Sequence, residues 1–306
     1  MGQARIAVIG NGIIGHGVAQ VFAAAGHPVT MVGRSAASLD GALANIRKSL
    51  ADFVANDLLS GSEADAAVAR IRTSTQLADA ADAEMVIEAV TEDLPLKLEI
   101  FGELDRLCPP QTILGSSSGQ PASALVAKVR HRERVIATHF WYPPQLIPLV
   151  EICGGPFCAP DILQRTVALI RGAGKEPVVI EKEVKGFIGN RLQFALLREA
   201  WALWADGVAS ADAIDAVVKA SFGRRIDITG PIESADIGGL ATMVAFGNSL
   251  IPDLSTASQA PEKVAARLQS GAAMPGIYDW SRRDAGELRA QRMAELFRWL
   301  KADRAK

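Results

Sequence analysis

A glycine-rich turn close to the N-terminus constrains the fold of this chain more than any other feature. The pattern GxGxxG occupies residues 10–15, directly after the apolar run Ile6–Ile9 and at the start of an Ala-rich helical stretch. In this context glycines allow a tight turn, close approach of the backbone to a pyrophosphate, and close packing of helix on strand. The alternative is an ordinary glycine-rich turn. The pattern favours a dinucleotide site, with the helix N-terminus facing the phosphates, formed by Gly10, Gly12, Ile13, Ile14 and Gly15.

Short β-branched runs alternate with helical stretches through the first half of the chain, which predicts a parallel sheet covered by helices on both faces. The predicted strands are Arg5–Ile9, Pro28–Val32, Met85–Ala89, Thr112–Gly115 and Val135–His139. The helical stretch Ser38–Leu59 is longer than a simple crossover, and we expect it to project as an arm or hairpin. From about residue 185 the pattern becomes helical throughout. We therefore predict an α/β fold: a Rossmann-type, doubly wound domain over residues 1–185, followed by an all-α substrate and dimerisation domain over residues 186–306.

The composition indicates a globular protein that binds neither nucleic acid nor membranes. The 306 residues include 32 Lys and Arg and 34 Asp and Glu, so the net charge is −2 and the chain lacks the basic surface of a nucleic-acid binder. No apolar run reaches the roughly 18 residues of a membrane span, and we see no secretory signal. The three cysteines, at 108, 153 and 158, have no CxxC spacing. We expect no disulfide framework, no metal site, and a cytoplasmic location.

The end of the second predicted strand bears on the choice between NAD(H) and NADP(H). An NAD site usually places Asp or Glu here, on the ribose hydroxyls, whereas this chain has Gly33, Arg34 and Ser35. With no carboxylate to repel a 2′-phosphate, Arg34 and Ser35 can donate hydrogen bonds to it. We expect NADP(H) to be favoured over NAD(H); an arginine that merely faces solvent is the alternative.

Four polar residues interrupt otherwise apolar surroundings, namely Ser118, His139, Glu151 and Asn190. Two prolines lie between His139 and Glu151, and if that segment folds back at its midpoint, the two side chains face each other. A carboxylate beside a histidine fixes its tautomer and raises its basicity. A histidine alone is more often a packed core residue, but a buried carboxylate nearby needs a partner, because an unpaired one is costly.

Several segments of the sequence are similar to those of a known family. They are residues 9–15 (IGNGIIG), 86–93 (VIEAVTED), 116–118 (SSS), 139–143 (HFWYP), 148–151 (PLVE) and 185–191 (KGFIGNR). Together they resemble the L-3-hydroxyacyl-CoA dehydrogenase superfamily over nearly the whole chain. Residues 147–151, 190–193 and 230–233 are most similar to its lambda-crystallin/L-gulonate 3-dehydrogenase and carnitine dehydrogenase branch.

The resemblance implies roles for individual residues. His139 is implied as the general base or acid, and Glu151 as its orienting partner. Ser118 and Asn190 are implied as hydrogen-bonding groups at the reacting oxygen. The nicotinamide and its ribose are expected near Glu92 and Lys97.

The sequence departs from the family pattern at positions that concern the substrate. Where CoA-using members carry a Lys for the CoA phosphate, this chain has Asp52, and a neighbouring Ser is replaced by Asn45. A carboxylate would repel the CoA 3′-phosphate. The family's Asn in the pocket wall is Tyr142 here, which we expect to contact substrate. Arg225 matches an Arg associated with small carboxylate substrates and can bind a carboxylate bidentately; a surface arginine is the alternative.

The sequence thus favours an enzyme: an NADP(H)-dependent 3-hydroxy dehydrogenase or ketoreductase acting on a small 3-hydroxy or 3-keto acid or ketone without CoA. Two alternatives stay open. One is an NAD-dependent 3-hydroxyacyl-CoA dehydrogenase, and the other is a catalytically silent nucleotide-binding structural or sensor protein. The apolar helical half indicates a homodimer. The natural substrate and the physiological direction are not identified by the sequence.

Overall fold

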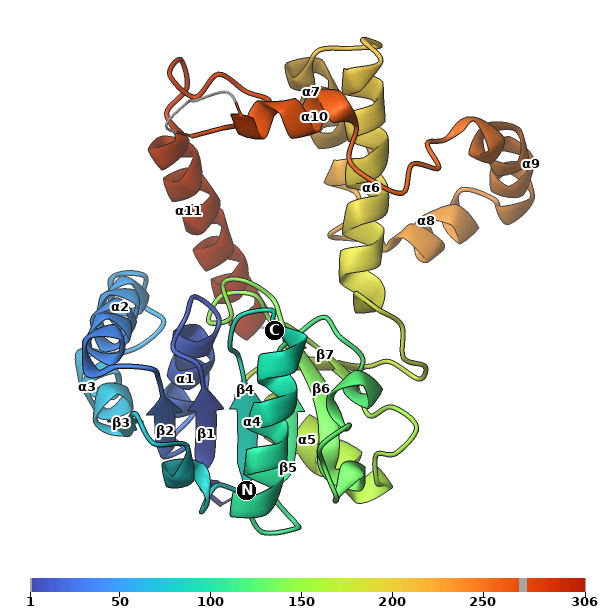
Figure 1. The fold of residues 1–306 in the computed structure, drawn as a ribbon. Helices are drawn as coiled ribbons and strands as arrows, with labels where there is room; N and C mark the ends of the chain where they lie inside the picture. The colour runs from blue at the N-terminus through green and yellow to red at the C-terminus, as the bar shows by residue number, and fades with distance from the viewer. Residues whose placement is uncertain (1, 270–273, 306) are drawn as a thin grey trace. The chain divides into compact units, whose positions relative to one another are not determined.

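The computed structural model describes residues 2–269 and 274–305, which form two compact units (Figure 1). The first unit comprises residues 2–188 and 290–305, and the second comprises the described residues between 189 and 289. The division into domains 1–185 and 186–306 stays a prediction. In the part of the chain that the structure describes, no helix is long and apolar enough to cross a membrane. Nor do these residues contain a cluster of three or more His, Cys, Asp or Glu side chains that could hold a metal ion.

An eight-stranded sheet, in the order β3-β2-β1-β4-β5-β6-β7-β8, forms the centre of the first unit. Neighbouring strands run parallel except for β6 and β7, which are antiparallel. The strand order reverses beside β1, as in doubly wound sheets, so the predicted fold class is confirmed. The strands are β1 Ile6–Ile9, β2 Val29–Val32, β3 Ile71–Ser74, β4 Met85–Glu88, β5 Ile113–Ser116, β6 Val135–Phe140, β7 Leu149–Cys153 and β8 Glu176–Val179.

Helices cover both faces of this sheet, as Figure 1 shows for α4 in front and α1 behind. Val18 and Ile46 belong to the core on one face, and Phe101 and Leu104 to the core on the other. Because both faces are covered, a central strand is apolar on both sides: all four residues of β1 are buried. The helices here are α1 Gly15–Ala24, α2 Ala36–Ala55, α3 Gly61–Ala69, α4 Leu94–Leu107 and α5 Pro160–Gly172.

The segment after β2 corrects one expectation. Most of the segment Ser38–Leu59, predicted to project as an arm or hairpin, lies in α2, which packs against the following helix α3. Because α2 also packs against α1, it does not project as an arm. Its buried residues recur every three or four positions, so one face of the helix joins the core. These residues are Leu39, Ala42, Ile46, Leu50 and Phe53. The half-buried edge strand β3 was not predicted, because its four residues carry little apolar signal.

The second unit is helical, as predicted. Its helices are α6 Phe187–Ala205, which begins in the first unit, α7 Ala211–Ala220, α8 Pro231–Ile237, α9 Leu240–Leu250 and α10 Glu262–Ala265. Gly239, with a positive φ of 93°, separates α8 from α9. Large apolar side chains are widely exposed in this unit, including Ile228 at 80% and Ile232 and Ile237 at 77% each.

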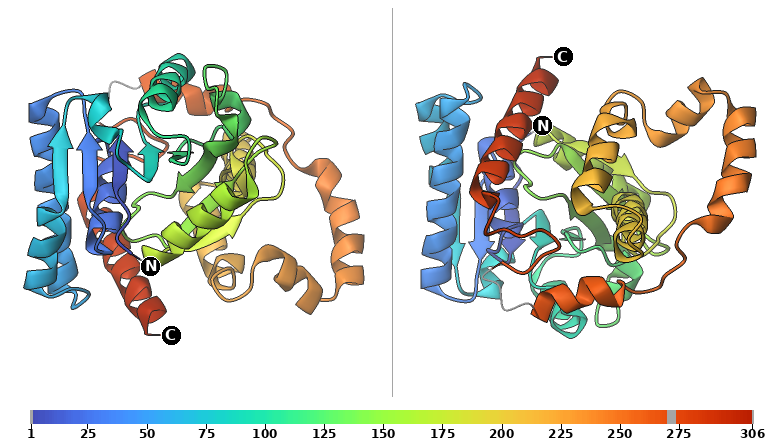
Figure 2. Two further views of the ribbon diagram at one scale, coloured as in Figure 1. Left: turned by 90° about the horizontal axis from the view of Figure 1, so that it is seen from below. Right: turned by 90° about the horizontal axis from the view of Figure 1, so that it is seen from above.

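The C-terminal helix α11, Ala285–Arg304, brings the chain back to the first unit. Leu296, Phe297 and Leu300 are buried there with Phe53 and Leu146. The rings of Phe53 and Phe297 meet edge to face with centroids 5.3 Å apart, a favourable aromatic geometry. Figure 2 shows this red end of α11 against the blue N-terminal part of the chain.

Candidate active site

The carboxyl ends of four neighbouring parallel strands meet at one edge of the sheet. Ile9 on β1 pairs with Glu88 on β4, Glu88 pairs with Ser116 on β5, and Ser116 pairs with Ala137 on β6. The glycine turn follows this row on β1, and His139 lies two residues beyond it on β6. The turn and the histidine therefore share the edge at which doubly wound sheets bind their ligands.

The glycine turn is shaped by close backbone contacts. Gly10 has a φ of +104°, and a Cβ there would lie 2.6 Å from the carbonyl oxygen of Ala89. A Cβ on Gly15 would lie 1.9 Å from the carbonyl oxygen of Gly10, so helix and turn can approach only with glycine at both positions. A Cβ on Gly12 would meet nothing within 4 Å. Gly12 therefore leaves free space beside the backbone, as a pyrophosphate requires.

A cavity of about 630 Å³ opens beside this turn. Its wall includes Gly10, Gly12, Gly33, Arg34, Asn45 and Thr91, from the ends of β1 and β2 and from α2 and the segment after β4. The side chain of Ile13 is 65% exposed and that of Ile14 packs against the core. Neither side chain lines the cavity, so any contact of these two residues with a cofactor would come from their backbone.

The residues after β2 take different positions. Arg34 is exposed and lines the cavity. The side chain of Ser35 accepts a hydrogen bond of 3.2 Å from the amide of Ser38 and caps α2. A Cβ at Gly33 would lie 2.8 Å from Oδ1 of Asn11. The side chain of Asn11 thus occupies the space beside the position where an NAD site usually carries a carboxylate.

A buried ion pair lies between β4 and α4. Nζ of Lys97 is 2.7 Å from Oε1 of Glu88, and the two side chains are 1% and 0% exposed. Glu88 also accepts hydrogen bonds from the Ser116 hydroxyl at 2.6 Å and from the Val90 amide at 2.7 Å. A buried carboxylate is tolerated when it is paired and hydrogen-bonded in this way. Glu88 and Ser116 were not predicted as site residues, although both fall in the segments that carry the resemblance.

Ser118 and Glu92 form a second contact at the same edge. The Ser118 hydroxyl donates to Oε1 of Glu92 at 2.6 Å and accepts from the amide of Gln120 at 3.0 Å. Oε2 of Glu92 is 3.5 Å from Nζ of Lys97. Partial burial raises the pKa of Glu92, but the hydrogen bond from Ser118 and the charge of Lys97 outweigh it, and the net pKa lies below the usual value. Glu92 is therefore an anion at neutral pH.

His139 and Glu151 lie directly opposite each other on the antiparallel strands β6 and β7. Nδ1 of His139 is 2.8 Å from Oε2 of Glu151, and the side chains are 10% and 2% exposed. With its proton on Nδ1, the ring donates to Glu151. Nε2, which has no hydrogen bond to a described residue, is then the nitrogen that can exchange a proton with a ligand.

Further groups hold the Glu151 carboxylate. Nε1 of Trp141 donates to Oε2 at 3.1 Å, and the amide of Ile188 donates to Oε1 at 3.0 Å. The ring of Phe187 lies 5.6 Å from that of His139. Trp141 was missed by the sequence analysis. The sequence spacing could have indicated it, because Trp141 is two residues from His139, and this spacing places two side chains on the same face of a strand.

The remaining predicted residues are Tyr142, Asn190 and Arg225. Tyr142 is 62% exposed on the segment after β6. Asn190 lies in the first turn of α6, and exposed Arg225 follows a short 3₁₀ helix at Phe222–Arg224. Asn190 and Arg225 both belong to the second unit. Their contact with the His139–Glu151 pair stays a prediction.

Comparison with known protein families identifies both parts of the chain. Residues 5–184 match the model "3-hydroxyacyl-CoA dehydrogenase, NAD binding domain", and residues 186–275 match "3-hydroxyacyl-CoA dehydrogenase, C-terminal domain". The chain belongs to the 3-hydroxyacyl-CoA dehydrogenase family. The NAD-binding part of the family spans the glycine turn, the Lys97–Glu88 pair and the His139–Glu151 pair. The family match therefore supports a nicotinamide cofactor for this part of the chain.

Relatives within the family are similar over most of their length. The chain is 36% identical to lambda-crystallin of Oryctolagus cuniculus, over 75% of this chain and 73% of that protein. It is 32% identical to 5-formyl-3-hydroxy-2-methylpyridine 4-carboxylate 5-dehydrogenase of Mesorhizobium japonicum, over 95% and 96%. A solved structure of a dehydrogenase of that name, described as an NAD+-dependent dismutase, superposes with a TM-score of 0.86 at 28% identity, covering 98% of this chain and 99% of that one. The resemblance to the superfamily and its lambda-crystallin branch is confirmed.

Trp141 offers a test of how this family member holds its histidine–glutamate pair. Trp141→Phe keeps an aromatic ring but removes the donor to Glu151. Losing one such hydrogen bond costs about 1 kcal/mol, so we expect kcat to fall roughly fivefold. The freed carboxylate should stabilise the imidazolium more strongly, so the acid limb of the pH–rate profile for alcohol oxidation should move to higher pH.

The control for this test is Trp299→Phe, a half-exposed tryptophan on α11. It should leave both kcat and the pH profile unchanged. If Trp141→Phe lowers activity without moving the pH profile, Trp141 has only a packing role.

Proposed function

We propose that this protein is an NADP(H)-dependent oxidoreductase that interconverts a secondary 3-hydroxyl group and a ketone on a small acid or ketone. The observation that carries the proposal is the buried His139–Glu151 pair at the same sheet edge as the glycine turn. A general acid–base group beside a dinucleotide site is the combination that alcohol oxidation by hydride transfer needs.

His139 moves the proton in this proposal. During oxidation Nε2 takes the proton of the substrate hydroxyl, and during reduction it returns a proton to the developing alkoxide. Glu151 accepts the Nδ1 hydrogen bond, fixes this tautomer, and stabilises the imidazolium that forms. Trp141 and the Ile188 amide keep the carboxylate in place.

The residues around the glycine turn fit a nicotinamide dinucleotide. Gly12 leaves free space for the pyrophosphate, and the cavity of about 630 Å³ reaches Arg34. The nicotinamide supplies or accepts the hydride when bound. Arg34 would bind a 2′-phosphate. Gly33 stands where an NAD site usually has a carboxylate, and the neighbouring Asn11 is uncharged, so neither residue would repel the phosphate. Ser35 caps α2 in the structure, so Arg34 is the main support for preferring NADP(H).

Ser118 and Asn190 would hold the reacting oxygen. In the structure the Ser118 hydroxyl donates to Glu92. For Ser118 to donate to a substrate oxygen, its proton has to turn away from Glu92. Lys97 compensates the buried charge of Glu88, and its Nζ also lies 3.5 Å from Glu92.

The substrate class rests on charges along α2 and on Arg225. Asp52 is exposed on α2, where its carboxylate would repel a CoA 3′-phosphate, and Asn45 lines the dinucleotide cavity. Arg225 is exposed and can bind a carboxylate bidentately, with Tyr142 as a further substrate contact. We therefore propose a 3-hydroxy or 3-keto substrate without CoA.

We further propose a homodimer in the cytoplasm. The second unit exposes large apolar side chains, among them Phe246 at 65% and Ile237 at 77%, and a second copy of the chain would cover them. The cysteines Cys108, Cys153 and Cys158 are free thiols, as a reducing compartment favours.

The reaction is tested by assaying NADPH oxidation with free 3-keto acids, cyclic and aryl ketones, and acetoacetyl-CoA. We expect the highest kcat/KM for a free acid or ketone. With that substrate, His139→Ala should lower kcat by at least ~100-fold, because the proton-transfer group is lost. The Kd for NADPH should stay unchanged.

His131→Ala, at a half-exposed histidine paired with Glu133, is the matched control and should keep full activity. Near-normal turnover of His139→Ala would show that His139 is a packed core residue. A kcat/KM for acetoacetyl-CoA above that of every free compound would overturn the substrate class.

The cofactor preference is tested by Arg34→Ala. Loss of a charged hydrogen bond to the 2′-phosphate costs about 1.5–3 kcal/mol, so the Kd for NADPH should rise roughly ten- to hundredfold. The Kd for NADH should change little. Arg47→Ala, an exposed arginine on α2 that does not line the cavity, is the control. Equal weakening of NADPH and NADH by Arg34→Ala would contradict the preference.

A further inference from the structure

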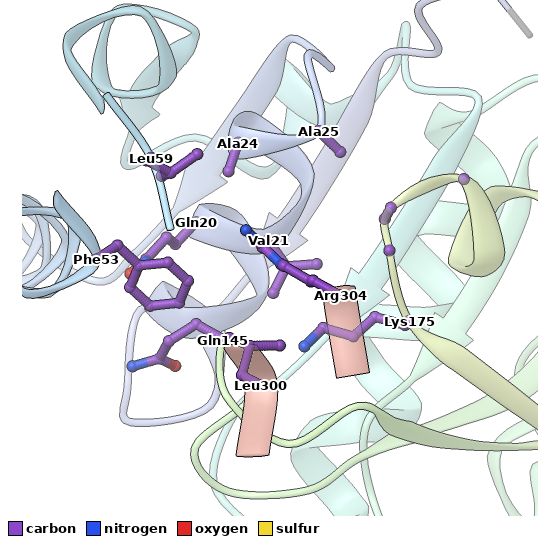
Figure 3. A pocket seen from close by; sticks show the side chains of 13 residues that line it. Gln20, Val21, Ala24, Ala25, Phe53, Leu59, Gln145, Lys175, Leu300 and Arg304 are labelled. Atoms are coloured by element: carbon purple, nitrogen blue, oxygen red, sulfur yellow. The ribbon is translucent and has the colours of Figure 1, made fainter. Parts of the chain in front are cut away.

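A second cavity lies in the first unit, away from the dinucleotide site. Its volume is about 280 Å³, and it shares no lining residue with the cavity beside the glycine turn. Much of its wall is apolar, with Val21 from α1, Phe53 from α2, Leu59 after α2, and Leu300 from α11 (Figure 3). The polar part of the wall comes from Gln20, Gln145, Lys175 and Arg304.

Lys175, directly before β8, is the unusual member of this wall. It is 8% exposed, and its Nζ donates to the carbonyl oxygen of Ile147 at 2.9 Å. Among the described residues, no carboxylate lies within 4.0 Å of this ammonium group. Burial, and then the nearby charge of Arg304, lower the pKa of Lys175 to about 7. A lysine buried in this way lacks a counter-ion.

Arg304 adds a second cation to the same cavity. Its Nη1 donates to the carbonyl oxygen of Leu58 at 2.9 Å. Burial lowers the pKa of Arg304, and the negative charge of Glu63 on α3, outside the cavity wall, offsets part of this effect. Figure 3 shows the side chains of Arg304 and Lys175 at the same pocket. The positive charges of Lys175 and Arg304 repel each other beside the open cavity. An anion bound there would attract both and so stabilise the charged side chains.

Two amide side chains complete the polar wall. Oε1 of Gln20, a residue 2% exposed, and Oε1 of Gln145 are buried without a hydrogen-bond partner among the described residues. Such unsatisfied groups are rare in folded proteins. The NH₂ group of Gln145 donates to the Ser49 hydroxyl at 3.4 Å. A hydroxyl can donate to an amide oxygen as readily as it accepts from an NH₂ group, so either amide can turn its NH₂ group toward an incoming oxyanion at little cost.

We propose that this cavity is a binding site for a small organic carboxylate with an apolar body. The carboxylate lies between Lys175 and Arg304, and the apolar body packs on Phe53, Leu59 and Leu300. The apolar wall is the reason to choose such a ligand over inorganic phosphate, which would leave that wall unfilled. The site is independent of the proposed reaction, because none of its residues belongs to the dinucleotide cavity or the His139–Glu151 pair.

Direct binding measurements test this inference. Titration calorimetry at pH 7 with hexanoate should show saturable binding to the full-length protein. Lys175→Met and Arg304→Met should each raise the Kd at least tenfold. Lys301→Met is the matched control, since Lys301 lies on the same helix but pairs with Asp57 outside the cavity. Inorganic phosphate should bind more weakly than hexanoate.

A second readout is specific to Lys175. The bound carboxylate favours the charged ammonium, so binding at pH 8 should take up a proton, and affinity should fall as the pH rises from 7 to 9. Comparing heats in two buffers of different ionisation enthalpy measures this uptake. Arg304→Met decides the charge requirement even if Lys175→Met fails to fold. Absence of saturable hexanoate binding, equal binding by Arg304→Met, binding without proton uptake, or tighter binding of phosphate would overturn the proposal.

Discussion

The carboxylate of Glu151 is 2% exposed, and a carboxylate so far from water is stable only when donors surround it. Its position is set by the antiparallel pairing of β7 with β6, which places Glu151 opposite His139. The donors then come from the His139 ring, the Trp141 indole and the Ile188 amide. The last of these lies at the start of α6. One buried charge thereby fixes the histidine, the segment after β6, and the point where the chain enters its helical part.

A second buried charge organises the other side of the same edge. Glu88 ends β4, and its carboxylate is held by Lys97 on α4 and by Ser116 on β5. Removing Lys97 alone would leave an unpaired buried carboxylate, which is strongly destabilising. The ion pair therefore holds α4 and the segment carrying Ser118 and Glu92 in register with the strands. The chemistry proposed for this edge depends on both charges being compensated.

The sequence predicts the parts of this arrangement that follow from local rules. The glycine turn and the fully buried strands around it are recognisable because glycine geometry and apolar runs are local signals. The contact between His139 and Glu151 could be expected from a double proline in a segment that folds back at its midpoint. Family resemblance supplied Glu92, Lys97 and Ser118 as site positions, whose roles stay proposals.

Other features depend on contacts that no local pattern carries. The edge strand β3 has only four residues, of which three are half-buried and one is exposed. The apolar stripe of α2 packs on α1 and α3, and no local pattern in the sequence distinguishes such a helix from a projecting arm. The return of α11 to the first unit depends on Phe53 and Leu146, which are far from it in the chain. The Ser35 hydroxyl accepts a hydrogen bond from the Ser38 amide, so a residue expected to bind the cofactor serves in the structure as a helix cap.

In the proposed reaction, Glu151 sets the basicity of His139 for proton transfer. The most direct measurement is the pH–rate profile of alcohol oxidation for Glu151→Gln beside the unaltered protein. The amide keeps the shape but loses the charge that stabilises the imidazolium, so the acid limb should move to lower pH and kcat should fall. An unchanged profile with unchanged kcat would show that the two side chains are neighbours in the core and that proton transfer occurs elsewhere.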